Sequence, residues 1–270
     1  MLLIQINSHI KIRSLLRIVL LGKRGAGKSS AGNTLLGKQP FYTAASSQRV
    51  TKDWSMSAST VDGHRISVVD TAGWTDLILM NDNTILEIAE WIDQSDPGPH
   101  VFLLVIPIGR FIKEETNTVH QILEVFGEEA HKYTMVLFTK GDDLEEMTIE
   151  DYLKDTHPDL KKIIEVCGGR YHVFNNRDKE NKKQVSDLLE KIKLMAKRNE
   201  GRNYTKAMYQ KTVDQIEVKW KRERIMNAAR AEVEKEINDS AVGSNYETTR
   251  SKNTELKPSP DTKGTVSTKE

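Results

Sequence analysis

The sequence predicts an α/β protein with a mostly parallel central sheet, helices on both faces of that sheet, and a helical extension at the C-terminal end. Two observations carry this prediction. Short, dense apolar runs alternate with longer segments whose apolar residues recur at helical spacing, and this alternation is typical of strand–helix–strand units. The first apolar run also leads directly into a glycine-rich loop, the usual turn between a buried strand and a helix at a ligand site.

Five apolar runs are expected to form strands that are buried on both faces of the sheet. They are near-continuous and rich in β-branched, aromatic and leucine side chains. The runs cover residues 15–21, 65–70, 100–106, 133–138 and 171–174. Because helical segments lie between successive runs, the strands are expected to pair mainly in parallel.

Four segments each carry one apolar stripe at the spacing of an amphipathic helix. The stripes are formed by Ile85, Ile88, Ala89 and Ile92; by Val119, Ile122, Leu123 and Phe126; by Leu160, Ile163, Ile164 and Cys167; and by Val185, Leu188, Leu189, Ile192 and Met195. Glycines follow the second and third stripes, at Gly127 and Gly168, where helices commonly end.

The composition divides the chain into four parts. We expect an N-terminal segment at 1–14, an α/β domain at 15–200, a charged helical extension at 201–239 and a disordered tail at 240–270. The tail is rich in Ser and Thr and almost without apolar residues, so it cannot offset the entropy lost on ordering. The extension is either an interaction element or a solvated helix, and its thin apolar stripe disfavours binding along a membrane surface.

Charge and cysteine content exclude several classes of protein. The chain has 40 Lys and Arg against 39 Asp and Glu, and this net charge of +1 argues against bulk electrostatic binding of nucleic acid. The single cysteine, Cys167, excludes an internal disulfide framework and favours a reducing compartment. No apolar run approaches the length of a membrane-spanning helix, and the first residues make a poor signal peptide. We therefore expect a cytoplasmic protein with no transmembrane segment.

The strongest motif follows the first expected strand. Residues 22–29 read GKRGAGKS and fit the phosphate-loop pattern G-x-x-x-x-G-K-[ST]. The glycines let backbone N–H groups curl round phosphate oxygens, Lys28 reaches the β- and γ-phosphates, and the Ser29 hydroxyl ligates Mg²⁺. The expected nucleotide-binding positions here are Gly22, Lys23, Arg24, Gly25, Ala26, Gly27, Lys28, Ser29 and Ser30. The loop predicts a purine nucleotide bound together with Mg²⁺.

A second motif, Asp70-Thr71-Ala72-Gly73, ends the second expected strand. In the D-x-x-G motif of nucleotide switches the aspartate holds Mg²⁺ through water and the glycine N–H senses the γ-phosphate, which are the roles expected of Asp70 and Gly73. The alternative is an ordinary turn at the end of a strand. The preceding phosphate loop favours the switch interpretation.

A third motif, Thr139-Lys140-Gly141-Asp142, fits the guanine-reading pattern [NT]-K-x-D. The Asp142 carboxylate would accept hydrogen bonds from N1–H and N2–H₂ of guanine and would face unmatched acceptors on adenine, which disfavours an ATP-dependent enzyme. The alternative is a solvated acidic turn. After the last expected strand, Asn175 and Asn176 provide amides for the base carbonyl. The sequence thus predicts a guanine nucleotide, GTP or GDP, at the carboxyl ends of the strands.

Together these motifs resemble the AIG1-type GTPases, also called immunity-associated nucleotide-binding (GIMAP or IAN) proteins. The resemblance rests on the phosphate loop, the base motif and three further stretches, and it covers about residues 16–198. The stretches are FLLVIPIGRF at 102–111, CGGRY at 167–171 and FNNR at 174–177. The resemblance implies a Ras-like P-loop GTPase fold, a role in immunity, and assembly through the nucleotide face as a homodimer, a homo-oligomer or a complex with related family members.

The resemblance also implies roles for individual residues. Thr51 would be the switch threonine that closes on Mg²⁺ and the γ-phosphate, and Thr43 would lie near the nucleotide just upstream. Arg110 matches an arginine that hydrolytic members present across the dimer. The alternative for Arg110 is an ion pair within its own loop, with Glu114 or Glu115.

The residue after the D-x-x-G motif bears on turnover. Ras-like hydrolases use a glutamine there to orient the attacking water, whereas this chain has Trp74, whose indole can only donate a hydrogen bond. We therefore expect a slow GTPase that converts GTP to GDP and phosphate, stimulated by self-association and an arginine supplied in trans, for which Arg110 is the candidate. The alternative function is a GTP-bound scaffold with negligible hydrolysis.

Overall fold

The computed structural model describes residues 15–43, 54–73, 88–92, 96–109, 111 and 113–253 of the 270-residue chain. The chain forms two compact units, Met1–Gln215 and Ile216–Glu270, and we describe each by itself. The expected N-terminal segment at 1–14 lies outside the described residues.

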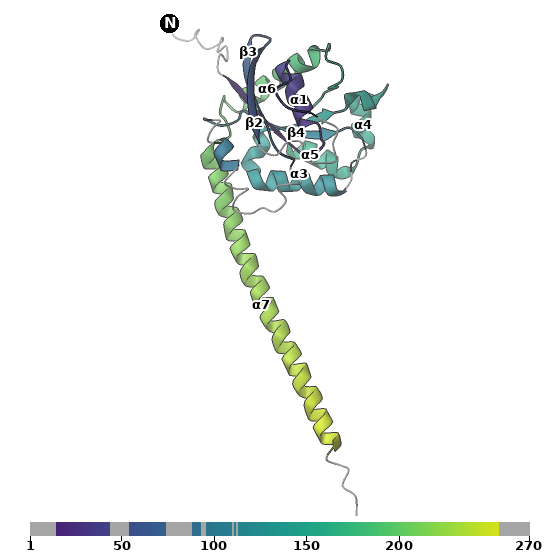
Figure 1. Cartoon of the computed structure of the whole chain (residues 1–270), viewed down its shortest axis with the longest axis vertical. Helices are drawn as coiled ribbons and strands as arrows, with labels where there is room; N and C mark the ends of the chain where they lie inside the picture. The colour runs from purple at the N-terminus through teal and green to yellow at the C-terminus, as the bar shows by residue number, and fades with distance from the viewer. Residues whose placement is uncertain are drawn as a thin grey trace, which may run out of the picture. The chain divides into compact units, whose positions relative to one another are not determined.

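A six-stranded sheet forms the centre of the first unit (Figure 1). The strands are β1 (Leu16–Leu21), β2 (Ser55–Val61), β3 (His64–Asp70), β4 (Val101–Pro107), β5 (Thr134–Thr139) and β6 (Tyr171–Val173). Their order is β2-β3-β1-β4-β5-β6, and every neighbouring pair is parallel except β2 with β3. The predicted α/β class with a mostly parallel sheet is confirmed.

Helices cover both faces of the sheet (Figure 1). The described helices of the whole chain are α1 (Lys28–Leu36), α3 (Lys113–Phe126), α4 (Ile149–Asp155), α5 (Pro158–Val166), α6 (Lys183–Arg198) and α7 (Lys206–Asn253), with 3₁₀ turns η2 (Glu128–Tyr133) and η3 (Gly141–Leu144); α7 enters the second unit at Ile216. Side chains of α1 and α6 pack on one face. Side chains of α3, α5 and residues 88–92 pack on the other.

Successive residues of the central strands alternate between these two cores. In β1, Ile18 and Leu20 pack with α1 and α6, whereas Val19 and Leu21 pack on the opposite side. Both sets are almost fully buried. This two-sided burial explains why the apolar runs are continuous. Helices α3, α5 and α6 carry three of the four apolar stripes expected from the sequence, and the residues of those stripes are buried against the sheet.

The antiparallel strand β2 was not expected from the sequence. It lies at the edge of the sheet, its residues alternate between exposed and half-buried, and it reads SMSASTV. An edge strand of this kind needs no apolar run, because only one of its sides is paired and little of it enters the core. The short helix α4, none of whose residues is buried, was not expected either.

The first residues of the expected extension belong to the first unit. Tyr204 and Tyr209 are buried in the same core as Phe126. The Tyr204 hydroxyl donates to the Phe126 carbonyl at 2.7 Å, and the Asn203 amide donates to the Gly98 carbonyl at 2.6 Å. The core of the domain therefore extends beyond residue 200, where the change in composition suggested a boundary.

Helix α7 continues to Asn253, so residues 240–253 are helical, whereas the composition predicted disorder from 240 onward. No proline lies between Lys206 and Pro258, and no backbone constraint ends the helix at 239. The rest of the expected tail, 254–270, lies outside the described residues. None of the described helices combines the length and the apolar content that crossing a bilayer requires.

Two buried histidines give the fold a testable pH dependence. Burial lowers the pKa of His100 and of His172 to about 4, with the Arg17 charge adding to the effect at His100. Nδ1 of His100 accepts a hydrogen bond from the Arg17 N–H at 3.0 Å. Nε2 of His172 is hydrogen-bonded to the Gln184 carbonyl at 2.8 Å. A histidine whose pKa is lower in the folded state than in the unfolded chain stabilises the fold above pH 6.5, and this contribution is lost as the pH falls toward 4.

We expect the double variant His100→Asn, His172→Gln to lose less stability than the wild type between pH 7 and pH 5, by roughly 3–4 kcal/mol for the two groups together. Urea unfolding at the two pH values measures the difference. His120→Asn, at an exposed position of α3, serves as the control. Equal losses in the wild type and the double variant would show that these histidines do not titrate in this range.

Candidate functional site

The carboxyl ends of the parallel strands meet at one edge of the sheet, where ligands of open α/β sheets bind. The segments that follow β1, β3, β5 and β6 carry the three motifs and the two asparagines predicted from the sequence. Leu20 of β1 is paired with Asp70 of β3, and Pro107 of β4 with Thr139 of β5. Within each pair the carboxyl ends of the two strands are therefore side by side at the edge of the sheet.

The loop at 22–27 has a backbone that favours glycine. Gly22, Gly25 and Gly27 have φ values of 147°, 76° and 92°. A Cβ on Gly22 would lie 2.5 Å from the Val105 carbonyl oxygen, so this position also lacks room for a side chain. The Thr139 hydroxyl donates to the Ala26 carbonyl at 2.7 Å and ties the loop to the end of β5. The loop therefore forms a backbone cradle held from the neighbouring strands.

Lys28 points its ammonium group back across this cradle. The side chain is buried, and Nζ donates to the carbonyl oxygens of Gly22 at 3.0 Å and Lys23 at 3.1 Å. Helix α1 begins at Lys28 with Gly27 as its N-cap residue and no side-chain cap. Its first N–H groups and the lysine thus present positive charge at the same place, the arrangement that binds phosphate.

Asp70 ends β3 and is buried beside Ser29. The Ser29 hydroxyl donates to Oδ2 at 2.6 Å, while Oδ1 is buried and has no hydrogen-bond partner among the described residues. Burial raises the pKa of Asp70, and the Ser29 hydrogen bond and the Lys28 charge oppose that increase. A buried carboxylate oxygen without a partner, next to a serine hydroxyl, offers the hard oxygen ligands that Mg²⁺ prefers. These residues therefore fit a hydrated Mg²⁺ ion.

The segment after β3 packs directly on the glycine-rich loop. A Cβ on Gly73 would lie 2.7 Å from the Arg24 Cα and 2.9 Å from its backbone nitrogen. The Thr71 hydroxyl donates to the Leu20 carbonyl at 2.7 Å and holds the segment to β1. Only glycine fits at position 73, which places its N–H beside the loop.

The base motif leaves β5 through a tight turn. Lys140 has a left-handed backbone, with φ of 56°, and the Gly141 N–H donates to the Phe174 carbonyl at 2.9 Å. The Asp142 carboxylate accepts a hydrogen bond from Arg177 at 2.6 Å, across from the segment after β6. A guanidinium and the N1–H, N2–H₂ edge of guanine are similar donors, so both can engage the same carboxylate.

The side chains of Asn175 and Asn176, the two residues expected to contact the base carbonyl, make different contacts within the protein. The Asn175 side-chain oxygen accepts from the backbone N–H groups of Arg177 at 2.9 Å and Asp178 at 3.3 Å, which makes Asn175 a turn-forming residue. Asn176 accepts from the Thr34 hydroxyl of α1 at 2.9 Å. The two asparagines therefore lie together in sequence but serve different contacts.

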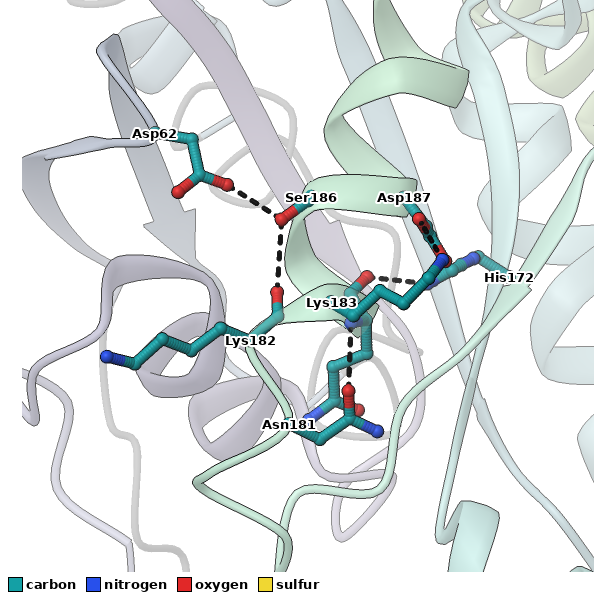
Figure 2. A network of polar contacts seen from close by, with 8 residues as sticks. Asp62, His172, Asn181, Lys182, Lys183, Ser186 and Asp187 are labelled. Atoms are coloured by element: carbon teal, nitrogen blue, oxygen red, sulfur yellow. Dashed lines mark hydrogen bonds and ion pairs between the residues drawn. The ribbon is translucent and has the colours of Figure 1, made fainter.

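Gln184 is a residue that the sequence did not point to. Its side chain is buried, accepts from the Asn175 N–H at 2.9 Å and donates to the carbonyls of Asn175 and Asp178, at 3.1 Å each. It fixes the turn from the start of α6, where Figure 2 shows the surrounding polar contacts of Asp62, Ser186 and His172. No motif marks a glutamine in the first turn of a helix, so the sequence carried no signal for this role.

A cavity of about 620 Å³ opens between α1, the turn joining β2 to β3, and the segment before α6. Ser30, Thr43 and Asn176, three of the predicted nucleotide positions, line it. Its volume is in the range of small-molecule sites, roughly 300–1,000 Å³. Thr51, Trp74 and Arg110 lie outside the described residues, and within the described ranges no three His, Cys, Asp or Glu side chains cluster as metal ligands.

Comparison with known sequences identifies related proteins. The profile of the AIG1 family matches residues 16–224. Immune-associated nucleotide-binding protein 10 of Arabidopsis thaliana is 37% identical over 227 residues, which cover 80% of this chain and 49% of that protein. Human GTPase IMAP family member 8 is 35% identical over 186 residues, or 68% of this chain and 27% of that protein. The chain thus spans about half the length, or less, of these two relatives.

Comparison with solved structures identifies the fold. Toc33 of Arabidopsis thaliana in complex with Mg²⁺ and GMPPNP has a TM-score of 0.53 and 21% identity, with 68% of this chain and 85% of that chain covered. A dimerisation-deficient mutant of Toc33 has a TM-score of 0.53 and 22% identity, with 67% of this chain and 84% of that chain covered. At this identity the likeness shows that the fold is that of a P-loop GTPase.

The contact between Arg177 and Asp142 predicts a competition. If Asp142 receives a guanine base, as its motif predicts, Arg177 must first leave it. An exposed ion pair contributes about 0.2–1 kcal/mol, so Arg177→Ala should raise the affinity for GDP by no more than about fivefold, through faster association.

Stopped-flow binding of a fluorescent GDP analogue measures this rate. Lys193→Ala removes another surface ion pair, with Glu190 on α6, and serves as the control. Slower association of the Arg177→Ala variant would instead assign the guanidinium a direct role in holding the nucleotide.

Proposed function

The chain belongs to the AIG1 family, and from this premise we propose that it is a switch protein that binds GTP and GDP with Mg²⁺ at the edge of its sheet. The observation that carries the proposal is the joining of Lys28, Ser29 and the buried Asp70 within one cradle of backbone N–H groups. Such a cradle favours a phosphate group, and the Asp70 oxygen, which no described residue contacts by a hydrogen bond, favours a hydrated cation beside it.

In the proposed complex the residues of the phosphate loop act by position and charge. Loop N–H groups between Gly22 and Gly27, apart from that of Ala26, which donates to the Lys23 carbonyl at 3.2 Å, would donate to the phosphate oxygens, and Lys28 would turn from the loop carbonyls toward the β- and γ-phosphates. The Ser29 hydroxyl would hold Mg²⁺ directly and the Asp70 carboxylate would hold it through water, with Thr51 as the proposed switch ligand. The bound Mg²⁺ neutralises charge on the phosphates. The Gly73 N–H then reports whether the γ-phosphate is present.

The base would be read by the segments after β5 and β6. Asp142 accepts from the guanine N1–H and N2–H₂ groups once Arg177 moves away. Thr139 and Lys140 shape the turn, and Asn176 lines the adjoining cavity. Asn175 acts indirectly, because its contacts with Gln184 and the Arg177 N–H support the turn that presents Asn176.

We further propose that two copies meet at this edge and that hydrolysis is slow unless they do. Among the fold relatives, dimerisation is important for the GTPase activity of the chloroplast translocon components Toc33 and Toc159. In this chain Arg110 directly follows Gly109, whose carbonyl accepts from the Tyr152 hydroxyl of α4 at 2.8 Å. That contact holds Gly109, the residue before Arg110, against α4.

Trp74 favours a second candidate, a GTP-bound scaffold with negligible turnover. An indole cannot accept a proton from the attacking water or orient it as an amide does. We place either form of the protein in the cytoplasm, because its one cysteine is an unpaired, buried thiol that suits a reducing compartment.

The first prediction concerns the base. Asp142→Ala should reduce GTP affinity by about 100-fold while leaving ATP affinity unchanged, because two hydrogen bonds to a charged acceptor are lost only with guanine. Competition binding against a fluorescent nucleotide measures both affinities. Asp143→Ala removes the neighbouring exposed carboxylate and should leave both unchanged. Retained GTP selectivity in Asp142→Ala would refute the assignment.

The second prediction concerns turnover. GTP hydrolysis per molecule should rise with protein concentration and should fall by about 10³-fold or more in Arg110→Ala, as expected for an arginine acting in trans. Initial rates across a wide concentration range measure this. Arg65→Ala, on the exposed face of β3, is the matched control. Flat, negligible turnover of the wild type at every concentration would instead establish the scaffold.

A further inference from the structure

Exposed apolar side chains gather on the part of α7 that belongs to the second unit. Half of the large exposed hydrophobic side chains of the described residues lie there, and each is more than 50% exposed. They are Val218, Ile225, Met226, Val233 and Ile237. Single exposed hydrophobic residues are common on protein surfaces, but a set of five on one helix is not.

These five side chains form a line along one face of the helix. At about 100° per residue they fall, together with Ala229, within roughly 120° of the helix circumference, an arc that also contains Lys219, Arg222 and Glu236. We call this set the apolar stripe. Asn227 and Ala231 fall on the opposite face. The stripe is distinct from the face of Tyr209 and Val213 that is buried in the first unit, because it lies roughly 140–180° around the helix from those two residues.

The described residues of the second unit do not themselves cover this part of α7. Every described residue from 221 to 235 is exposed. Isolated helices in water are marginal even when their sequence favours them, and most helical stability in proteins comes from burial of an apolar face. The apolar stripe thus indicates a partner along this length.

The charges on this part of the helix, counted over all of its faces, are divided along its length. Residues 216–225 contain four Lys or Arg and two Asp or Glu, whereas residues 226–239 contain two Lys or Arg and four Asp or Glu. The first half is therefore basic and the second acidic. A surface with this division is complementary to a reversed copy of itself, since the basic half of one helix then faces the acidic half of the other.

We propose that a second copy of this chain pairs with α7 in antiparallel orientation through the apolar stripe. A parallel pair would bring basic half to basic half and acidic half to acidic half, which is unfavourable. An anionic membrane surface would attract only the basic half and repel the acidic half. This contact uses neither the nucleotide edge nor bound GTP, so it is independent of the proposed function.

The pairing is tested by introducing two lysines in the apolar stripe and, in a control protein, two lysines on the opposite face of the helix. Ile225→Lys with Val233→Lys should weaken dimerisation of the full chain in GDP by at least tenfold, measured by sedimentation velocity across concentration. Asn227→Lys with Ala231→Lys adds the same charge on the opposite face and should leave dimerisation unchanged. Far-ultraviolet circular dichroism of all three proteins checks that the helix content is retained.

The orientation is tested by disulfide trapping, which is practical because the native Cys167 is buried. Val218→Cys mixed with Val233→Cys or with Ile237→Cys should cross-link under oxidation, while Val218→Cys alone should not. Cross-linking of Val218→Cys with itself would show a parallel pair and overturn the proposed arrangement.

Dependence on nucleotide separates this contact from the proposed nucleotide-edge dimer. The α7 pair should persist in GDP and in Arg110→Ala, whereas an edge dimer should respond to a non-hydrolysable GTP analogue. A full chain that stays monomeric in GDP at 100-micromolar-scale concentration would overturn the α7 pair. So would equal dimerisation of the stripe and opposite-face variants, or monomeric protein that binds vesicles of anionic lipid through the stripe.

Discussion

The hydrogen bond from Ser29 to the buried carboxylate of Asp70 is the contact on which the geometry of the nucleotide edge depends. It joins the first turn of α1 to the end of β3 at 2.6 Å. Since β1 and β3 are adjacent and parallel in the sheet, the chain has only residues 22–27 in which to leave β1 and enter α1 beside that carboxylate. Such a short path needs the positive φ angles that glycine adopts, and the same path turns the N–H groups inward.

The cost of burying Asp70 explains the charges around it. Burial disfavours the ionised carboxylate, and the Lys28 ammonium and the Ser29 hydroxyl offset part of that cost. Within the described part of the chain, one oxygen of this carboxylate still has no hydrogen-bond partner. An edge of this kind is stabilised by a cation and by phosphate, so ligand binding and the stability of the edge are expected to be linked. The hydrogen bond from Thr139 to Ala26 joins the glycine-rich loop to the end of β5, where the base motif begins.

The sequence predicted those features that are encoded locally. Two-sided burial of parallel strands produces continuous apolar runs, and the loop at 22–29 is specified by its own glycines and lysine. Features that depend on distant partners were missed. Strand β2 is an edge strand whose polar residues leave no apolar run, and the role of Asn175 is determined by Gln184 of α6. The composition places the end of the helical extension at residue 239, whereas α7 continues to Asn253, because no proline interrupts the chain between Lys206 and Pro258. Thr51, Trp74 and Arg110 lie outside the described residues, and their roles stay predictions from the sequence.

The central claim is that this edge binds a guanine nucleotide together with Mg²⁺. Isothermal titration of the full chain with GDP and with ADP, each in Mg²⁺ and in EDTA, tests it most directly. The account predicts that GDP binds at least about 100-fold more tightly than ADP, because adenine leaves the Asp142 carboxylate unmatched. It also predicts that EDTA weakens GDP binding. Equal affinities for the two nucleotides, or GDP binding that is indifferent to Mg²⁺, would contradict the account.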